Sequence, residues 1–423
     1  MKVFSTLIML LCFIGIPMKA QQTTYYTNVS NKQIKTLQVK VAGEMFSNPC
    51  IELNGEDRIE INFDALNSGG VRYAYSLIHC NADWTKSILS PIEYMNGFQG
   101  MTIDDFANSM GTTVQYTNYR LLIPNEDVQP KVSGNYALTV YKEDNPAAIV
   151  FTACFSVVEP IVGVSASVSG NTDIDTNQSH QQVSFAINNK NFSIPYPQTD
   201  LKIWVYQDNR RDNAVTGLQP MSILENQITY SNNQKLIFEA GNEYRRMEFL
   251  SNKYNGMHIQ NITFHNPYYN VELMKDYKRT SESYQYDQDQ DGRFFIRCSN
   301  CNDPDTEADY FIVHFTLACD EIPEGNVYLN GELYNNVLDN NSKMDYNPET
   351  NQYEKAVLLK QGSYNYQYLF VPDGQTVGET GPIEGNFYQT ENEYSIYVYY
   401  HPMGTRYDRL IGVTSVKNAM QVF

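Results

Sequence analysis

The chain has 423 residues, with 30 Lys and Arg against 48 Asp and Glu, so its formal net charge is −18. A surface of this sign repels nucleic acid and anionic lipid, which proteins bind through clustered basic residues. Tyrosine and phenylalanine are abundant, at 33 and 20 residues, and long windows of strong helix formers are missing from the sequence. This composition predicts an all-β protein, and the length suits roughly two to four domains.

The first residues have the pattern of a cleaved export signal. Lys2 gives a positive start, and residues 3–16 form a short apolar run before the expected cut at Gln21. That run is too short to span a bilayer, which needs about 18 consecutive apolar residues. We therefore expect residues 1–20 to be removed on export. Loss of Lys2 and Lys19 leaves 28 basic against 48 acidic residues, a charge of −20.

Strands with alternating apolar and polar residues recur along the chain. They include RIEINFD (58–64), GNYALTVYKED (134–144), DLKIWVYQ (200–207) and EYSIYVYY (393–400). Turn-forming clusters such as SGN, NGE and PDG separate these runs, as in hairpins and sandwich loops. One helical turn is expected, in TIDDFANSM (102–110), where Thr102 can act as the N-cap.

The grouping of the strands predicts three tandem immunoglobulin-like β-sandwich domains. The first covers residues 31–158, and Pro160 follows it as a break. A polar, loop-like stretch opens the second, which covers residues 159–278, and the third covers residues 279–423. Each range has the size of one immunoglobulin-like sandwich.

The stretch YDQDQDGRFFIRCSNC (286–301) contains half of a metal motif. Asp287, Asp289 and Asp291, with a glycine after the third, match the first half of a calcium loop. The twelfth position of such a loop needs a bidentate carboxylate, and here it is Cys298. Asp-Gly before RFFIR is typical of a hairpin turn, so we favour a hairpin over a weak cation site.

Six cysteines follow the export signal: Cys50, Cys80, Cys154, Cys298, Cys301 and Cys319. An even number in an exported chain permits disulfides, and their pairing stays open. The CxxC pair at 298 and 301 has one further thiol nearby in sequence, which is too few ligands for a structural zinc site. We expect either a loop disulfide or two free thiols there.

No residue pattern indicates catalysis. The six histidines are scattered, without an HExxH motif, and the sequence has neither a GxSxG elbow nor a glycine-rich phosphate loop. We therefore predict no enzymatic activity, no catalytic or metal-binding residues and no cofactor. Tyrosines in 328–336 and 362–370 could line a glycan-stacking surface. Sugar platforms favour tryptophan, however, and only Trp84 and Trp204 occur.

Several segments, in this order, resemble the plug protein of the type IX secretion system of Bacteroidota. They are YSLIHCNADWTKS with EYMNGF (75–98), YTNYRLLIPNEDVQPKVSGNYALTVY (116–141), DLKIWVYQDNRRDNA (200–214), LIFEAGNEYRRME (236–248), and DYFIVHFTLAC (309–319) through YEKAVLLKQGSYNYQYLF (353–370). The resemblance covers nearly the whole mature chain.

This resemblance implies a binding protein and no enzyme. Members of the family are similar to a periplasmic stopper that associates with a giant outer-membrane translocon barrel and closes its periplasmic mouth when no cargo passes. The implied location is the periplasm, at the inner side of the outer membrane, without membrane insertion. The implied partner is the translocon barrel, with no nucleic acid and no small-molecule substrate. The third domain is also similar to early-set modules attached to glycan-active enzymes, so a glycan- or surface-binding accessory protein is the alternative.

Two arginine pairs are the predicted partner-binding residues. They are Arg210, Arg211, Arg245 and Arg246. The pairs lie in QDNRRDNA (207–214) and GNEYRRME (241–248), the densest arginine sites of an acidic chain. Each guanidinium can form a forked contact with a partner carboxylate. The alternative is intramolecular pairing with the neighbouring acids Asp208, Asp212 and Glu243.

Overall fold

The structure, a computed structural model, describes residues 23–66 and 69–418. It is nearly all β, as the composition predicts. Within the described residues, each of the three α-helices has four residues, and none has the length and apolar character of a membrane span. The expected export signal, residues 1–20, lies outside the described part of the chain.

The N-terminal unit is a sandwich of two sheets. One sheet has the order β1-β12-β11-β5-β7 with β3 beside β12, the other has the order β2-β4-β9-β8, and β6 pairs with β10. The elements are β1 (Asn28–Val29), β2 (Ile34–Val41), β3 (Cys50–Glu52), β4 (Ile59–Leu66), β5 (Tyr73–Cys80), α1 (Pro91–Tyr94), β6 (Met95–Gly97), β7 (Met101–Thr102), β8 (Phe106–Asn108), β9 (Tyr116–Ile123), β10 (Val128–Pro130), β11 (Gly134–Lys142) and β12 (Asn145–Val158). Phe63 of β4 stacks on Tyr119 of β9 and meets Phe151 of β12 edge-on at 4.6 Å between ring centroids, which joins the two sheets.

Local predictions for this unit have mixed outcomes. The alternation predicted in residues 58–64 is correct, since Ile61 and Phe63 are fully buried. The opposite face of β4, which carries Asp64, is buried as well because the C-terminal unit packs over it. The helical turn expected at 102–110 is wrong, because these residues form the end of β7 and all of β8.

The middle unit is a sandwich that includes the last two strands of the chain. Its sheets have the orders β13-β14-β18-β17, with β19 beside β14, and β16-β15-β30-β31. The elements are β13 (Gly163–Ser169), β14 (His180–Asn188), α2 (Pro197–Asp200), β15 (Leu201–Gln207), β16 (Val215–Thr216), β17 (Ser222–Leu224), β18 (Gln227–Tyr230), the 3₁₀-helix η1 (Gln234–Leu236), β19 (Ile237–Glu239), β30 (Glu393–Tyr400) and β31 (Arg409–Lys417).

The C-terminal unit is formed by β20 to β29. Its sheets have the orders β21-β22-β25-β28-β27, with β23 beside β25, and β20-β29-β24, with β26 beside β29. The elements are β20 (Arg245–Phe249), β21 (Ile259–His265), β22 (Tyr268–Leu273), β23 (Asp276–Tyr277), β24 (Phe294–Ile296), α3 (Pro304–Glu307), β25 (Tyr310–Ala318), β26 (Gly325–Asn330), the 3₁₀-helix η2 (Glu332–Tyr334), β27 (Asp345–Asn347), β28 (Gln352–Lys360) and β29 (Gly362–Pro372).

Strand pairing crosses the boundary that the sequence suggested after residue 278. β20 pairs with β29 and β22 with β25, so residues 245–277 belong to sheets of the C-terminal unit. In the other direction, β30 pairs with β15 along seven residues and with β31 on its other side. Alone, these strands would expose unpaired backbone edges. We therefore propose a middle unit of residues 159–244 and 393–418 and a C-terminal unit of residues 245–392.

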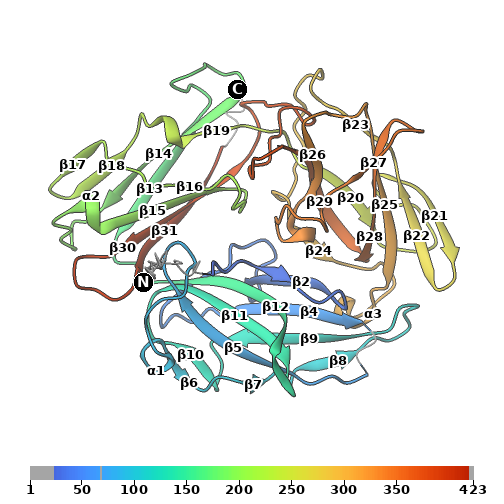
Figure 1. Ribbon diagram of the computed structural model, residues 1–423, viewed down its shortest axis with the longest axis horizontal. Helices are drawn as coiled ribbons and strands as arrows, with labels where there is room; N and C mark the ends of the chain where they lie inside the picture. The colour runs from blue at the N-terminus through green and yellow to red at the C-terminus, as the bar shows by residue number, and fades with distance from the viewer. Residues whose placement is uncertain (1–22, 67–68, 419–423) are drawn as a thin grey trace, which may run out of the picture.

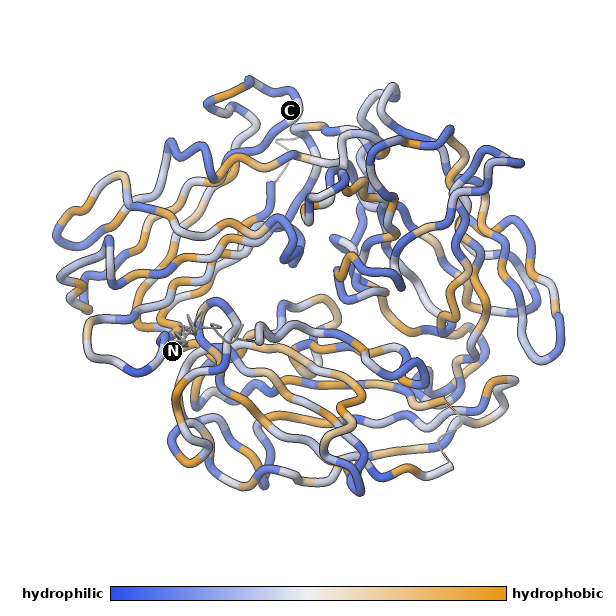
Figure 2. The backbone as a smooth tube through the Cα atoms, in the orientation of Figure 1, coloured by the Kyte–Doolittle hydropathy of each residue, from blue (hydrophilic) through white to orange (hydrophobic). Residues whose placement is uncertain are grey.

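The three units surround a common centre, with the N-terminal unit below and the other two on either side in the view of Figure 1. Each unit has its own hydrophobic core. Apolar stretches lie along the strands of all three units, and hydrophilic stretches are frequent in the outer loops (Figure 2). Because the cores are separate, contacts between the units decide whether the molecule behaves as one body.

Candidate functional site

The three units meet at one buried arginine, Arg293, which is 5% exposed. Its Nη2 donates to Asn48 Oδ1 of the N-terminal unit at 2.9 Å and to Glu393 Oε2 of the middle unit at 2.9 Å. Its Nη1 lies 3.2 Å from Asp291 Oδ2 in its own unit. Lys417 of β31 reaches the same Asp291 oxygen at 2.7 Å. A single side chain therefore connects all three units.

Further buried polar contacts join the units in pairs. Lys360 Nζ of β28 lies 2.7 Å from Asp64 Oδ2 of β4, and these side chains are 1% and 0% exposed. The Tyr399 hydroxyl of β30 donates to Asn135 Oδ1 of β11 at 2.8 Å. Such contacts have directional geometry, so they favour one relative orientation of the units.

Arg210, predicted to bind a partner, is 4% exposed in the structure. Its Nη2 lies 2.6 Å from Asp212 Oδ2 and donates to the Gly378 carbonyl at 2.6 Å. The Gly378 N–H donates to the same Asp212 oxygen at 2.9 Å. These bonds connect the middle unit to the C-terminal unit, and they leave the guanidinium almost no surface for a partner molecule.

The second arginine pair also has intramolecular carboxylate partners. Arg245 Nη1 lies 2.9 Å from Asp276 Oδ1, and its Nη2 lies 2.9 Å from Glu384 Oε2, with an exposed side-chain fraction of 10%. Arg246 forms a forked contact with Asp287, at 2.6 Å for the shorter bond, and its side chain is 26% exposed. Arg246 is thus the more accessible member of this pair.

Arg211 differs from the other three predicted arginines. Among the described residues it has no carboxylate within ion-pair distance. Its Nη1 donates to the Tyr25 carbonyl at 2.7 Å, and its guanidinium carbon lies 4.1 Å from the centre of the Trp84 ring. The structure therefore separates the four arginines: it brings no two of them into one site, and it leaves one with an unpaired positive charge.

The DQDQDG segment does not form the predicted hairpin. Residues 281–290 contain no strand, and β24 pairs with β29 instead of with the segment before it. Asp291 and Gly292 have φ of 51° and 80°, so the Asp-Gly turn itself is present. Asp289 accepts two backbone N–H bonds, from Tyr244 and from Asp291. The described residues contain no cluster of three or more His, Cys, Asp or Glu side chains suited to hold a metal ion.

The same segment places several carboxyl groups in a poorly solvated boundary between the middle and C-terminal units. Burial, with repulsion from Asp291 as the next cause, raises the pKa of Asp289 to about 8. Burial, again with repulsion from Asp291, raises the pKa of Asp208 well above its usual value. Asp291 has a raised pKa through burial, opposed by Lys417 and Arg293. Protonation and these two cations therefore limit the negative charge at this boundary.

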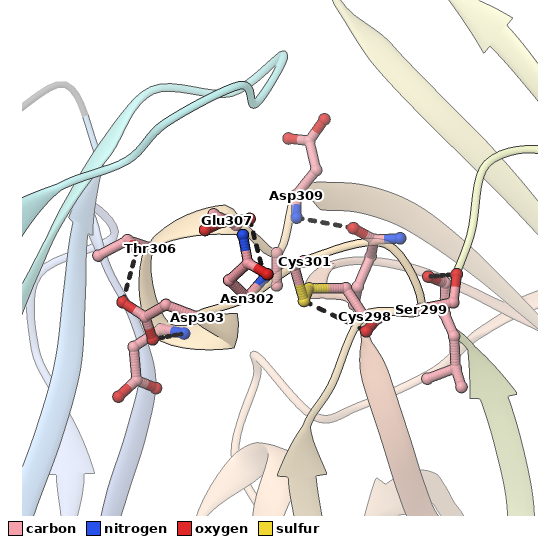
Figure 3. The surroundings of a disulfide bond; sticks show 12 residues. Cys298, Ser299, Cys301, Asn302, Asp303, Thr306, Glu307 and Asp309 are labelled. Atoms are coloured by element: carbon pink, nitrogen blue, oxygen red, sulfur yellow. Dashed lines mark hydrogen bonds between the residues drawn. A yellow bond between two sulfur atoms is a disulfide. The ribbon is translucent and has the colours of Figure 1, made fainter.

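Cys298 and Cys301 form a disulfide, one of the two alternatives for the CxxC pair. It lies just before α3, whose N-cap Asp303 accepts hydrogen bonds from the Asp305 N–H and the Thr306 hydroxyl (Figure 3). The other described cysteines, Cys50, Cys80, Cys154 and Cys319, are free thiols. The disulfide fits an oxidising compartment.

A cavity of about 430 Å³ lies where the three units meet. The N-terminal unit contributes Trp84, the middle unit Tyr206 and Arg211, and the C-terminal unit the loop 335–338. Thr376, an exposed residue, also lines it, so the cavity reaches solvent. Its volume falls in the range of about 300–1,000 Å³ that is common for small-ligand sites.

The fold and these sites define the class of the molecule: an all-β protein of three sandwiches whose polar clusters connect its units. A family model described as "Type 9 secretion system plug protein 1st domain" matches residues 34–159, the N-terminal sandwich. The chain belongs to the type IX secretion system plug protein family, which confirms the resemblance seen in the sequence. The family's name denotes a structural part of a secretion system and no catalyst.

A crystal structure is similar over almost the whole chain. It is that of a hypothetical protein from Parabacteroides merdae ATCC 43184, which is 79% identical and superimposes with a TM-score of 0.93. The match covers 94% of this chain and 100% of that one. No curated protein matches the chain.

Sequence reasoning missed the cavity. Trp84 stood out only as one of two tryptophans, and Tyr206 only as part of an alternating strand. The cavity residues come from three units that are far apart in sequence, so no local motif could indicate them. The one available signal was Arg211, in a pair selected for its local charge density.

Proposed function

We propose that the mature protein is a periplasmic plug of the type IX secretion system that binds the outer-membrane translocon barrel and closes its periplasmic opening when no cargo is in transit. Membership of the plug family supports this role. The export-signal pattern of residues 1–20 supports delivery to the periplasm. The protein acts by binding and carries out no reaction.

The observation that carries the proposal is the connection of the three sandwiches by buried polar contacts. A stopper for a wide aqueous channel must present a large surface that is already formed before it meets the barrel. Domains linked by small polar interfaces normally move relative to one another. Here Arg293 joins all three units, and the buried Lys360–Asp64 pair adds a second link between the N-terminal and C-terminal units.

The plug must also detach, so its contact with the barrel is moderate in size and polar in character. The mature charge of −20 favours a basic rim on the barrel. Of the predicted partner-binding arginines, Arg246 combines surface exposure with a forked geometry that a partner carboxylate could take over from Asp287. We keep Arg246 as the partner-binding candidate of this proposal.

Of the two tyrosine stretches that suggested glycan binding, 362–370 no longer supports it, whereas Tyr328 and Tyr334 of 328–336 are half-buried. The tyrosines of 362–370 face the core: Tyr364, Tyr366 and Tyr368 are at most 1% exposed. A side chain with no exposed ring face cannot stack on a sugar. We therefore advance no second function.

The test is an affinity pull-down of the tagged native protein from detergent-solubilised outer membranes, followed by mass spectrometry. We expect a very large β-barrel subunit at near-equal amount. Its reproducible absence, with the protein recovered free, would overturn the proposal.

A pair of charge reversals tests the arginine part separately. Arg246→Glu should reduce co-purification of the barrel while the thermal midpoint changes little. Arg72→Glu is the matched control, because Arg72 is 63% exposed and pairs with an exposed Glu143 in the N-terminal unit. Equal recovery of the barrel by both variants would rule out Arg246 as a contact residue and leave the pull-down result standing.

A further inference from the structure

The cavity at the centre of the three units has a mostly apolar wall. Aromatic and aliphatic side chains from all three units line it: Leu37, Val39, Trp84, Phe155, Tyr206, Val337, Leu338, Tyr397 and Tyr399. Tyr206 and Tyr397 meet edge-on at 5.6 Å between ring centroids. A wall of this kind favours an apolar or aromatic body over a purely polar ligand.

One positive charge in this wall lacks a counterion. Arg211 stacks on Trp84 and uses one nitrogen on the Tyr25 carbonyl, and the described residues supply no carboxylate partner. The two acids of the wall do not neutralise it. Asp212 is held by Arg210, and burial raises the pKa of Glu332. Removing a charge from water without a partner costs free energy, so a bound anion would stabilise Arg211.

Two hydrogen-bonding groups of the wall also lack partners. Trp84 and Tyr206 are each 8% exposed, and neither Trp84 Nε1 nor the Tyr206 hydroxyl forms a hydrogen bond within the described structure. Burial raises the pKa of Tyr206, and Arg211 and the nearby Trp84 indole oppose this increase. The indole N–H and the Tyr206 hydroxyl do not reach hydrogen-bond geometry. Both polar atoms are enclosed, so a ligand in the cavity meets the two rings and not these atoms.

Trp84 is held by a backbone conformation that large side chains rarely adopt. Its φ is 63°, in the left-handed region, within a turn closed by the Trp84 N–H bond to the Asn81 carbonyl at 2.9 Å. A bulky residue there costs about 1–3 kcal/mol, and such strain clusters at binding sites. The turn keeps the indole under Arg211 and in the cavity wall.

We propose that this cavity binds a small ligand that combines a carboxylate with an apolar or aromatic body. The carboxylate pairs with Arg211, and the body contacts the aromatic wall that includes the Trp84 and Tyr206 rings. Arg211 is also one of the arginines predicted to bind the partner, but Arg246, the candidate kept for the barrel contact, does not line this cavity. The proposal does not depend on the plug function.

The test uses a matched pair of probes, N-acetyl-L-phenylalanine and its neutral amide, which differ only in the carboxylate. Each probe is titrated into the purified full-length mature protein, and binding is measured by calorimetry and by tryptophan fluorescence. Fluorescence should respond because Trp84 lines the cavity and Trp204 stacks on Tyr206, which also lines it. We expect one site with roughly tenfold or greater preference for the acid, as a charged hydrogen bond provides. Absence of binding by either probe at millimolar concentration, or equal binding of both, would overturn the proposal.

Two variants locate the site. Arg211→Gln, which can still donate to the Tyr25 carbonyl, should abolish the preference for the acid. Tyr206→Phe keeps the ring, so it should bind the acid like the native protein and leave thermal stability unchanged or higher, because the lost hydroxyl has no partner in the free protein. Arg72→Gln, outside the cavity and exposed, is the control and should bind like the native protein. Full acid binding by Arg211→Gln would place the ligand elsewhere and refute the assignment.

Discussion

His79 is fully buried between the strands of the N-terminal sandwich and the loop before β11. Its Nδ1 lies 2.9 Å from the Ser87 hydroxyl, and its Nε2 lies 3.1 Å from the Ser133 carbonyl. Burial lowers the pKa of His79 to about 4, although the Ser133 carbonyl and Asp408 favour the charged form. The folded protein therefore holds this ring neutral at the pH of most compartments.

This shift predicts an acid-sensitive fold. Between pH 6.5 and about 4 the unfolded chain binds a proton at His79 that the folded chain does not, so stability is present above pH 6.5 and falls as the pH drops through this window. The loss amounts to about 3 kcal/mol. His79→Gln should flatten the dependence of the unfolding free energy on pH in that window, measured by urea denaturation. An unchanged dependence of the unfolding free energy on pH would show that groups other than His79 control the acid sensitivity.

Gly134 provides a second prediction at the scale of one residue. Its φ is +136°, and an added Cβ would lie 2.5 Å from His79 Nε2 and 3.3 Å from the Asp408 carbonyl oxygen. Gly134→Ala should therefore destabilise the protein by about 2–4 kcal/mol, through both backbone strain and overlap. Gly43 has φ of +84° with no atom within 4 Å, so Gly43→Ala isolates the strain and should cost about 1 kcal/mol. Equal thermal midpoints for the two variants would contradict this account.

The contact between β4 and β28 depends on one buried ion pair. Asp64 accepts from Lys360 Nζ at 2.7 Å, from the Tyr310 hydroxyl at 2.6 Å and from Asn118 Nδ2 at 2.8 Å. Lys360 also lies 4.2 Å from the centre of the Tyr116 ring. A buried carboxylate that loses its cation keeps its desolvation cost without the compensating attraction.

Lys360→Met should accordingly destabilise the protein by about 3–5 kcal/mol, measured by chemical denaturation. Adding Asp64→Asn should recover a large part of that loss, because the unpaired charge disappears while hydrogen-bonding capacity remains. Arg72→Met, which breaks an exposed pair, should change stability by less than about 1 kcal/mol. A double variant as unstable as Lys360→Met alone would show that the charge is not the cause.

Elements with strong local patterns could be predicted from the sequence, and their partners could not. EYSIYVYY at 393–400 is a strand as expected, but it joins β15, about 190 residues earlier, instead of the sandwich around it in sequence. The Asp-Gly turn at 291 formed without its hairpin because β24 pairs with β29. The polar face of β4 is buried because a distant unit covers it. The alternation of apolar and polar residues predicts which side of a strand faces its own core. It does not indicate which distant strand or unit the strand contacts.

The same limit applied to the candidate sites. Local charge density selected Arg210 as a partner-binding residue, whereas the structure has the alternative, pairing with Asp212, and adds the Gly378 carbonyl, which is 168 residues away. Nothing in the sequence indicated that Arg211 would stack on Trp84. Residues that form a site through distant contacts require the folded arrangement of all three units.

At the scale of the whole molecule, small apolar clusters and buried polar contacts hold three separate cores together. One cluster, which includes Tyr206, Tyr399 and Leu410, packs the middle unit on the N-terminal unit, and a second contains Tyr116 and Tyr310 at the boundary with the C-terminal unit. Apolar contacts supply attraction with little directional preference, whereas charged hydrogen bonds select one geometry. The relative orientation of the units should therefore depend on the polar contacts.

Arg293 gives the direct test of this dependence. Arg293→Met removes the bonds to Asn48 and Glu393 at once, while Asp291 keeps Lys417. We expect a loss of roughly 2–4 kcal/mol and faster hydrogen exchange at the three segments that meet there, with unchanged protection inside each sandwich. Arg72→Met is the control, since its pair with Glu143 is exposed and lies within the N-terminal unit. Faster exchange in only one sandwich core would indicate local unfolding, whereas faster exchange confined to the three segments would mean that this side chain fixes how the three units meet.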